Sequence, residues 1–180
     1  LVCEFSGIHE VSTEQQLTNF TRAMALQLNK GLPLPPAANW FEAFDRMAVL
    51  LKQKLRRKKA VVFLDEFPWM QTPKSNFLAA FENFWNTWAS RQPRLAIIIC
   101  GSAASWMIQH VVRNKGGLHN RITRKIALRP FSLHETELFL HSRKVYLNRY
   151  QVTQLYMAVG GVPLYLEQAK PGLSAVQIID

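Results

Sequence analysis

Long hydrophobic runs are absent from this sequence, and we expect no secretory leader. No stretch approaches the roughly 20 apolar residues that cross a bilayer. The opening Leu-Val-Cys-Glu-Phe also lacks the charged, apolar and small-residue parts of a leader. We therefore expect a cytoplasmic protein with no membrane partner. Cysteine is scarce too: Cys3 and Cys100 are the only two, and their apolar surroundings favour reduced core thiols over a disulfide framework or a zinc site.

Acidic residues are also scarce relative to basic residues. The chain has 12 Asp and Glu against 22 Lys and Arg, which leaves a net charge of +10. Such an excess favours a polyanionic partner, which can be a nucleotide, a nucleic acid or an acidic protein surface. The densest basic run, Lys52 to Lys59, ends a predicted helix. Cations there complement the negative end of the helix dipole, and a nucleic-acid contact is the alternative interpretation.

Apolar residues are plentiful, at 48% of 180 residues, which suits one domain with the start of a second. Apolar runs alternate with segments of helical spacing, a pattern that predicts an α/β protein. We divide the chain into an α/β core at 1–130 and a helical lid or subdomain at 131–180. The predicted strands lie at 1–5, 60–64, 94–100 and 122–128, and the main predicted helices at 13–28, 39–55, 77–88, 105–112, 133–141 and 152–159.

Two of these segments carry strong packing signals. Residues 94–100 form a continuous apolar run, which is typical of a central parallel strand covered on both faces. The helix at 77–88 places aromatic side chains on one stripe, at Phe77, Phe81, Phe84, Trp85 and Trp88. Core packing explains this stripe better than base binding does.

Adjacent carboxylates follow the apolar strand at 60–64. Ligands of open α/β folds bind beyond the carboxyl ends of the strands, and Asp65 and Glu66 stand at such an end. In phosphoryl-transfer enzymes one acid holds Mg²⁺, while a neighbouring acid can orient and deprotonate the attacking water. A helix cap or a turn acid is the structural alternative, and it explains a single acid better than this adjacent pair.

Ser102 ends the next apolar strand. Its hydroxyl can sense a terminal phosphate or hold the attacking water, or it can cap the helix that follows, and both interpretations stay open. Arg121 can neutralise phosphate charge as arginine fingers do, or lie solvated at the surface. A serine-hydrolase nucleophile is disfavoured because no Gly-x-Ser-x-Gly occurs. His119 has no second histidine at metal-ligand spacing.

Four motifs occur in a fixed order. They are Val61-Val-Phe-Leu-Asp-Glu-Phe-Pro-Trp, Ile98-Ile-Cys-Gly-Ser-Ala-Ala-Ser-Trp-Met, Ile126-Ala-Leu-Arg-Pro-Phe-Ser-Leu-His-Glu and Gly160-Gly-Val-Pro-Leu-Tyr-Leu. Together they resemble the archaeal-type ATPase family of the AAA and STAND group of P-loop NTPases, over most of residues 60–170. The resemblance implies a three-layer P-loop NTPase-like parallel sheet, incomplete at its N-terminus, with a Walker B strand at 61–65 and a sensor-1 strand at 95–100. It also implies ATP and Mg²⁺ as ligands.

The resemblance assigns ligand-binding roles to residues for which the sequence pattern alone indicates only a structural role. By themselves, residues 160–163 indicate a helix stop followed by a proline-started helix. The resemblance matches Gly161 and Pro163 to the family's Gly-x-Pro turn near the adenine. It also places Arg121 where such proteins often have an arginine. The family often has glycine before that arginine, where this chain has Asn120.

The phosphate-binding loop is the missing motif. The sequence contains no Gly-x-x-x-x-Gly-Lys-Ser/Thr. In this family the loop precedes the segment resembling residues 1–10, so we expect the sequence to start just after it. Without the loop's N–H groups and lysine, we expect this polypeptide to bind ATP weakly and hydrolyse it negligibly. Loss of the loop's strand would also leave an open sheet edge, which favours a homo-oligomer.

Two functions therefore compete. The first is an ATPase of this family, or a fragment of one, in which ATP binding controls a partner or an appended domain. The second is a non-enzymatic module that binds nucleic acid through its basic surface, on a degenerate ATPase fold. A salt-dependent shift of labelled DNA without any nucleotide effect would favour the second.

Overall fold

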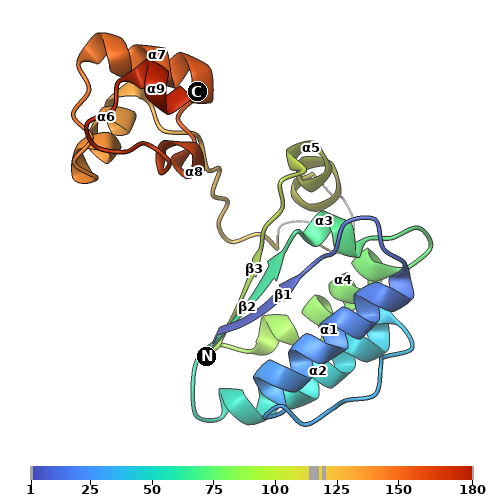
Figure 1. Cartoon of the computed structure of the whole chain (residues 1–180). Coiled ribbons are helices and arrows are strands. Elements are labelled where there is room, and N and C mark those ends of the chain that lie inside the picture. The colour runs from blue at the N-terminus through green and yellow to red at the C-terminus, as the bar shows by residue number, and fades with distance from the viewer. Residues whose placement is uncertain (1, 114–117, 119–120, 180) are drawn as a thin grey trace. The chain divides into compact units, whose positions relative to one another are not determined.

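Strands and helices alternate along the first two thirds of the chain, as the sequence pattern predicted. The computed structural model (Figure 1) describes residues 2–113, 118 and 121–179. It divides into two units, Leu1–Thr123 and Arg124–Asp180, and each is described by itself. The first unit is α/β with a parallel sheet, which confirms the predicted fold class. The assignment of 1–130 and 131–180 to separate domains stays a prediction.

In the described residues of the first unit, three strands alternate with helices, and two short helical segments follow the last strand. In chain order its elements are β1 (Val2–Ser6), α1 (Thr13–Leu28), α2 (Trp40–Leu55), β2 (Ala60–Asp65), α3 (Phe67–Met70), α4 (Phe77–Thr87), the 3₁₀ turn η1 (Ala89–Arg91), β3 (Leu95–Ile99), α5 (Ala104–Met107) and the π-helical turn η2 (Ile108–Val112). Local signals start the two long helices. Ser12 and Gln15 form a reciprocal capping box at α1, and Asn39 caps α2.

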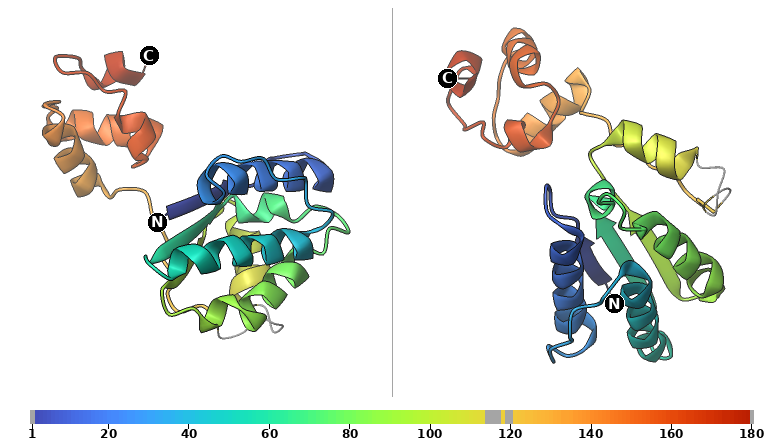
Figure 2. Two further views of the ribbon diagram at one scale, coloured as in Figure 1. Left: turned by 90° about the horizontal axis from the view of Figure 1, so that it is seen from below. Right: turned by 90° about the vertical axis from the view of Figure 1, so that its right-hand side faces the viewer.

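The sheet has the strand order β1-β2-β3, and both pairs are parallel. Every second residue of β1 and β2 is buried, because α1, α2 and α4 cover that face of the strands (Figures 1 and 2). The aromatic stripe of α4 packs into this core, which confirms its predicted role. Phe44 of α2 lies at the centre, where its ring contacts those of Phe20, Trp40, Phe77, Phe81 and Phe84.

The opposite face of the sheet is less covered. Phe63 of β2 is partly exposed there, and Ala96 and Ile98 of β3 are exposed. β3 lies at the edge of the described sheet, so the prediction of a central strand covered on both faces is wrong for the described residues. Cys100, which follows β3 on this face, is exposed, whereas Cys3 is buried as predicted for a core thiol.

The outer edge of β1 is closed by side chains of α1. The Gln27 carboxamide accepts a hydrogen bond from the Glu4 N–H at 2.7 Å and donates one to the Glu4 carbonyl at 2.6 Å. Asn19 donates to the Ser6 carbonyl at 3.2 Å. These amide groups take the positions that the backbone of a further strand would need, so this side of the sheet cannot easily extend.

The outer edge of β3 has no such closure among the described residues. The Cys100 N–H donates to the Leu64 carbonyl at 2.9 Å, so the even-numbered residues of this strand bond inward to β2. The alternation of a parallel ladder then turns the backbone groups of Ile97 and Ile99 outward. A further strand can therefore pair with the sheet at β3.

The second unit is helical and has its own core. It contains α6 (Leu133–Ser142), α7 (Arg149–Val159), α8 (Pro163–Leu166) and α9 (Ala175–Ile179). Capping boxes at Ser132 and Asn148 start its two longer helices. None of the helices in the described parts of the chain combines the length and apolarity that a membrane crossing requires.

The predicted strand at 122–128 is absent. These residues adopt no regular structure and are exposed, Leu128 to 90%. The local apolar pattern was therefore misleading, because a strand forms only where a neighbour satisfies its backbone groups. No described strand lies in register beside this segment.

Candidate functional site

Asp65 and Glu66 stand where the chain leaves β2. Asp65 is the last residue of the strand, and its carbonyl accepts the Gly7 N–H at 2.9 Å. Glu66 then turns the chain into α3 through a left-handed conformation, with φ 44° and ψ 45°. That conformation costs a residue with a Cβ about 1–2 kcal/mol, and such strain concentrates at functional sites. Both side chains are partly exposed, so a ligand can reach the carboxylates.

The Glu66 carboxylate connects the ends of β2 and β3. Its Oε2 accepts hydrogen bonds from the Ser102 backbone N–H at 3.3 Å and from Ser102 Oγ at 3.1 Å. The parallel register, which pairs Leu64 with Ile99, carries Ser102 to this place. The sequence left open whether Ser102 caps the next helix. The N-cap of α5 is Ala103, without a side-chain hydrogen bond, so the Ser102 hydroxyl serves Glu66 instead.

Cys100 adds a thiol to the same strand ends. Although Cys100 is exposed overall, partial desolvation of its thiol raises its pKa, and the negative charge of Asp65 and a hydrogen bond between the two side chains raise that pKa further. The thiol therefore stays protonated at neutral pH and donates to the Asp65 carboxylate. We call Asp65, Glu66, Cys100 and Ser102 the strand-end cluster.

Two glycines allow the backbone to pack around the strand-end cluster. A Cβ on Gly7 would overlap the Glu66 carbonyl oxygen, and one on Gly101 would lie 2.5 Å from Pro68 Cδ. The loop after β1 therefore packs closely against Glu66, and residue 101 packs closely against α3. Sequence reasoning missed the role of Gly7. The available signal was a glycine directly after the first predicted strand, which marks close approach of two backbones.

Arg121 is not brought to the strand-end cluster by any described contact. The residue is exposed, and its backbone N–H donates to the Leu118 carbonyl at 3.1 Å. Among the described residues, no hydrogen bond or ion pair joins its guanidinium to either carboxylate. His119 and Asn120, which the sequence analysis also considered, lie outside the described residues.

Gly161 and Pro163 belong to the second unit. The Phe131 N–H donates to the Gly161 carbonyl at 2.7 Å, and a Cβ at residue 161 would overlap the Phe131 backbone. Close backbone packing alone therefore requires glycine at this position. Pro163 is exposed and begins α8, a position that suits proline because it needs no N–H there. The turn has a complete structural explanation, and its adenine-binding role stays a prediction.

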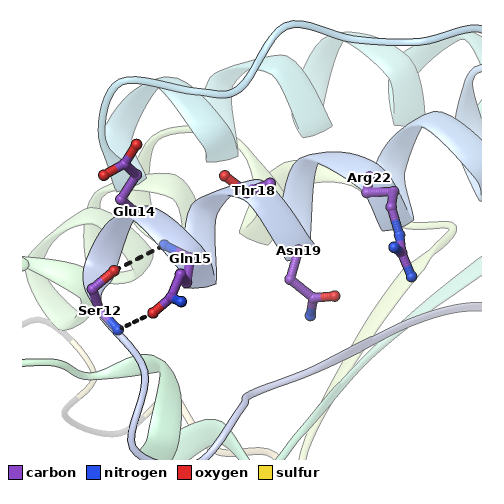
Figure 3. Close-up of a pocket in the computed structure, with 6 residues that line it drawn as sticks. All are labelled: Ser12, Glu14, Gln15, Thr18, Asn19 and Arg22. Carbon is purple, nitrogen blue, oxygen red and sulfur yellow. Dashed lines mark hydrogen bonds between the residues drawn. The ribbon is translucent and has the colours of Figure 1, made fainter.

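Other candidate sites are limited. A hollow of about 560 Å³ runs along α1 (Figure 3), lined by Ser12, Glu14, Gln15, Thr18, Asn19 and Arg22. Three of these side chains already serve the fold, in the capping box of α1 and at the edge of β1. Within the described ranges, no three His, Cys, Asp or Glu residues gather as a metal site. A metal at the strand-end cluster would therefore need oxygen ligands from elsewhere.

Comparison with known proteins agrees with the α/β fold. Residues 5–169 match a family described as an ATPase domain predominantly from Archaea. Among solved structures, the chain is similar to the Walker-type ATPase PABY2304 of Pyrococcus abyssi, with a TM-score of 0.60 and 15% sequence identity. The match covers 93% of this chain and 54% of that one, so the chain spans about half the length of that protein. No curated protein matches the sequence.

Proposed function

The chain belongs to the family of ATPase domains found predominantly in archaea, and on that premise we propose that it supplies the magnesium-binding and water-activating part of an ATP site. One observation carries the proposal: Glu66 receives two hydrogen bonds from Ser102, so the acidic end of β2 and the polar end of β3 form one cluster. Ligands of parallel α/β sheets bind at such strand ends. The finer assignment to AAA or STAND ATPases rests on the motif order.

Asp65 and Glu66 suit Mg²⁺ and water in different ways. Mg²⁺ is usually held by one or two carboxylates together with substrate phosphates and waters, and a site with few protein ligands fits that pattern. Asp65 would hold the ion, which neutralises phosphate charge when bound. Glu66 would orient and deprotonate the attacking water. Ser102, through its hydrogen bonds, positions the Glu66 carboxylate and can sense the phosphate that leaves.

The remaining predicted residues are assigned to the phosphates and to the adenine. We propose that Arg121 neutralises phosphate charge, since an exposed guanidinium is free to reach a ligand. We assign Gly161 and Pro163 to the adenine side of the site, by their match to the family's Gly-x-Pro turn.

The phosphates themselves lack a cradle in these 180 residues. A phosphate-binding loop supplies backbone N–H groups, a helix N-terminus and a lysine, and the strand-end cluster offers mainly acceptors. We therefore expect the polypeptide alone to bind ATP·Mg²⁺ weakly, with a Kd of about 1 mM or higher. This Kd corresponds to a binding free energy of about −4 kcal/mol or one that is less favourable. Hydrolysis should be negligible.

Paramagnetic broadening tests the magnesium assignment. Mn²⁺·ATP added to the isotope-labelled chain should broaden the amide signals of Gly7, Gly101 and Ser102. Asp65→Asn should remove this broadening. Asp45→Asn, the same charge change on the exposed face of α2, should leave it intact. Equal broadening in the Asp65→Asn variant would overturn the assignment.

Steady-state phosphate release tests the catalytic expectation separately. The purified polypeptide should show no turnover above the background of its Glu66→Gln variant. Robust turnover that disappears in Glu66→Gln would overturn the expectation that the polypeptide is inactive by itself, while supporting the role of Glu66.

A second function has its own support. The net charge of +10 and the basic end of α2 favour a non-enzymatic module that binds nucleic acid. A homo-oligomer is a further proposal, because the edge of β3 can accept another strand. Duplex binding without any Mn²⁺·ATP broadening at Gly7, Gly101 and Ser102 would favour the module over the ATPase.

A further inference from the structure

A basic hollow lies where α2 ends and the chain turns into β2. It has a volume of about 640 Å³ and is lined by Gln53, Lys54, Arg56, Arg57 and Lys58. All of these side chains are exposed except that of Lys54, which is half-buried. No acidic residue occurs between Arg46 and Asp65. The hollow is therefore a concentrated source of positive potential.

The end of α2 does not need these cations for its own stability. The Lys54 carbonyl accepts the N–H groups of Arg57 and Lys58, both at 3.1 Å. The Arg94 guanidinium donates to the Arg56 carbonyl at 3.2 Å and more weakly to Leu55 at 3.5 Å. The terminal carbonyls thus already have partners, including one cation that complements the helix dipole. The side chains of the basic hollow remain available for a ligand.

Among the described residues, no acidic side chain forms an ion pair with a cation of the basic hollow. The described ion pairs involve Arg46, Arg143, Arg149 and a histidine, and none of them includes a cation of this hollow. Like charges held close together without counter-charges repel each other. An external polyanion would supply the missing counter-charge.

The cations of the basic hollow lie too far from the strand-end cluster to contact a ligand bound there. β2 begins at Ala60, beside the hollow, and ends at Asp65. Five residue steps of a strand span about 17 Å, so the hollow lies at the beginning of β2 and the carboxylates lie at its other end. Figure 1 shows the course of β2. Phosphates bound near Asp65 would therefore not contact the basic hollow, which requires a ligand of its own.

The side chains around the hollow indicate the class of this ligand. Within 52–59 the only apolar residue, Leu55, is buried. Protein partners usually bury aromatic or apolar anchors, membrane-surface sites insert apolar side chains, and single-stranded nucleic acids stack on aromatic rings. The hollow offers only cations and one amide. We propose that the basic hollow binds the phosphate backbone of duplex nucleic acid, without sequence preference.

Fluorescence anisotropy with labelled duplexes of DNA and RNA tests the proposal, in the absence of nucleotide. Affinity is measured from about 50 to about 200 mM salt. The triple variant Arg56→Gln, Arg57→Gln, Lys58→Gln should bind at least about tenfold more weakly, and its log–log salt slope should be shallower by about 2.7, at about 0.9 per lost phosphate contact. Thermal unfolding should be unchanged, because these side chains are exposed.

The matched control removes the same charge elsewhere. Arg124→Gln, Lys125→Gln, Arg129→Gln neutralises three exposed cations of the second unit and should keep the affinity and slope of the unmodified chain. Equal losses in both triple variants would overturn the proposal, because binding would then follow net charge alone. Tighter binding to polyglutamate, to phosphatidylserine vesicles or to single strands than to duplexes would also overturn it. Asp65→Asn should not change duplex binding, which separates this proposal from the ATP site.

Discussion

Gly101→Ala is expected to damage the strand-end cluster through a steric effect that can be worked out from the structure. The new Cβ would lie 2.5 Å from Pro68 Cδ and 2.9 Å from Pro68 Cγ. Carbon atoms prefer separations of about 3.5–4.0 Å, so residue 101 and α3 must move apart by about 1 Å. The φ of Gly101 is not left-handed, so alanine meets no backbone penalty, and the effect comes from this overlap alone.

The overlap translates into a measurable loss. Overpacking costs about 1–3 kcal/mol, and a displacement of about 1 Å would break the hydrogen bonds of Ser102 to Glu66, which start at 3.1 and 3.3 Å. Each contributes about 1 kcal/mol or less at this exposed place. We therefore expect the free energy of unfolding to fall by about 2–4 kcal/mol. Ser102→Ala removes only the hydroxyl bond and should cost about 1 kcal/mol or less.

Urea denaturation followed by tryptophan fluorescence measures this difference. All five tryptophans lie within Leu1–Thr123, so the signal reports on the first unit without interference from the second. If Gly101→Ala were within about 0.5 kcal/mol of the unmodified protein, the close packing of residue 101 on Pro68 would be refuted, and with it the explanation for glycine at this position.

Three further outcomes are expected. Phe44→Ala, which empties the centre of the aromatic core, should cost about 3–5 kcal/mol, whereas Phe41→Ala on the same helix, 40% exposed, should cost about 1 kcal/mol or less in the same denaturation assay. Iodoacetamide should alkylate Cys100 more slowly than a free cysteine at pH about 8, because its raised pKa lowers the thiolate fraction. Asp65→Asn removes one cause of the raised pKa and should speed alkylation, and an unchanged rate would contradict the contact between the two side chains. Gly161→Ala should increase hydrogen exchange within 124–180 and leave the exchange of the first unit unaltered.

The sequence predicted the long elements of the fold because their signals are local. The capping residues Ser12 and Asn39 start the helices α1 and α2, and the aromatic spacing of α4 identifies its buried face. The prediction of a strand at 122–128 was wrong because strand formation does not depend on local signals alone. The apolar alternation of this segment was present, but pairing depends on a neighbouring strand, which no local pattern can specify.

The candidate site was predictable in its residue types and not in its contacts. The position of Asp65 and Glu66 after an apolar strand indicated a strand-end site, and the structure places them there. The bond from Ser102 to Glu66 depends on the register of β2 and β3, which is set by packing across the sheet. The close approach of Gly7 to Glu66 depends on how the loop after β1 folds over the strand ends. Until that register is known, the sequence is equally consistent with Ser102 as a helix cap and with Ser102 as a hydrogen-bond partner of a carboxylate.

The carboxamide of Gln27 has a consequence for how copies of this chain could associate. Because it occupies the outer backbone groups of Glu4, strand addition is confined to one side of the sheet. Two copies that joined through their β3 edges would present only the closed β1 edges to the surroundings. Growth would then stop at a pair with twofold symmetry, instead of continuing into a fibre. The amide side chains of α1 that close the β1 edge can thereby set the stoichiometry of assembly.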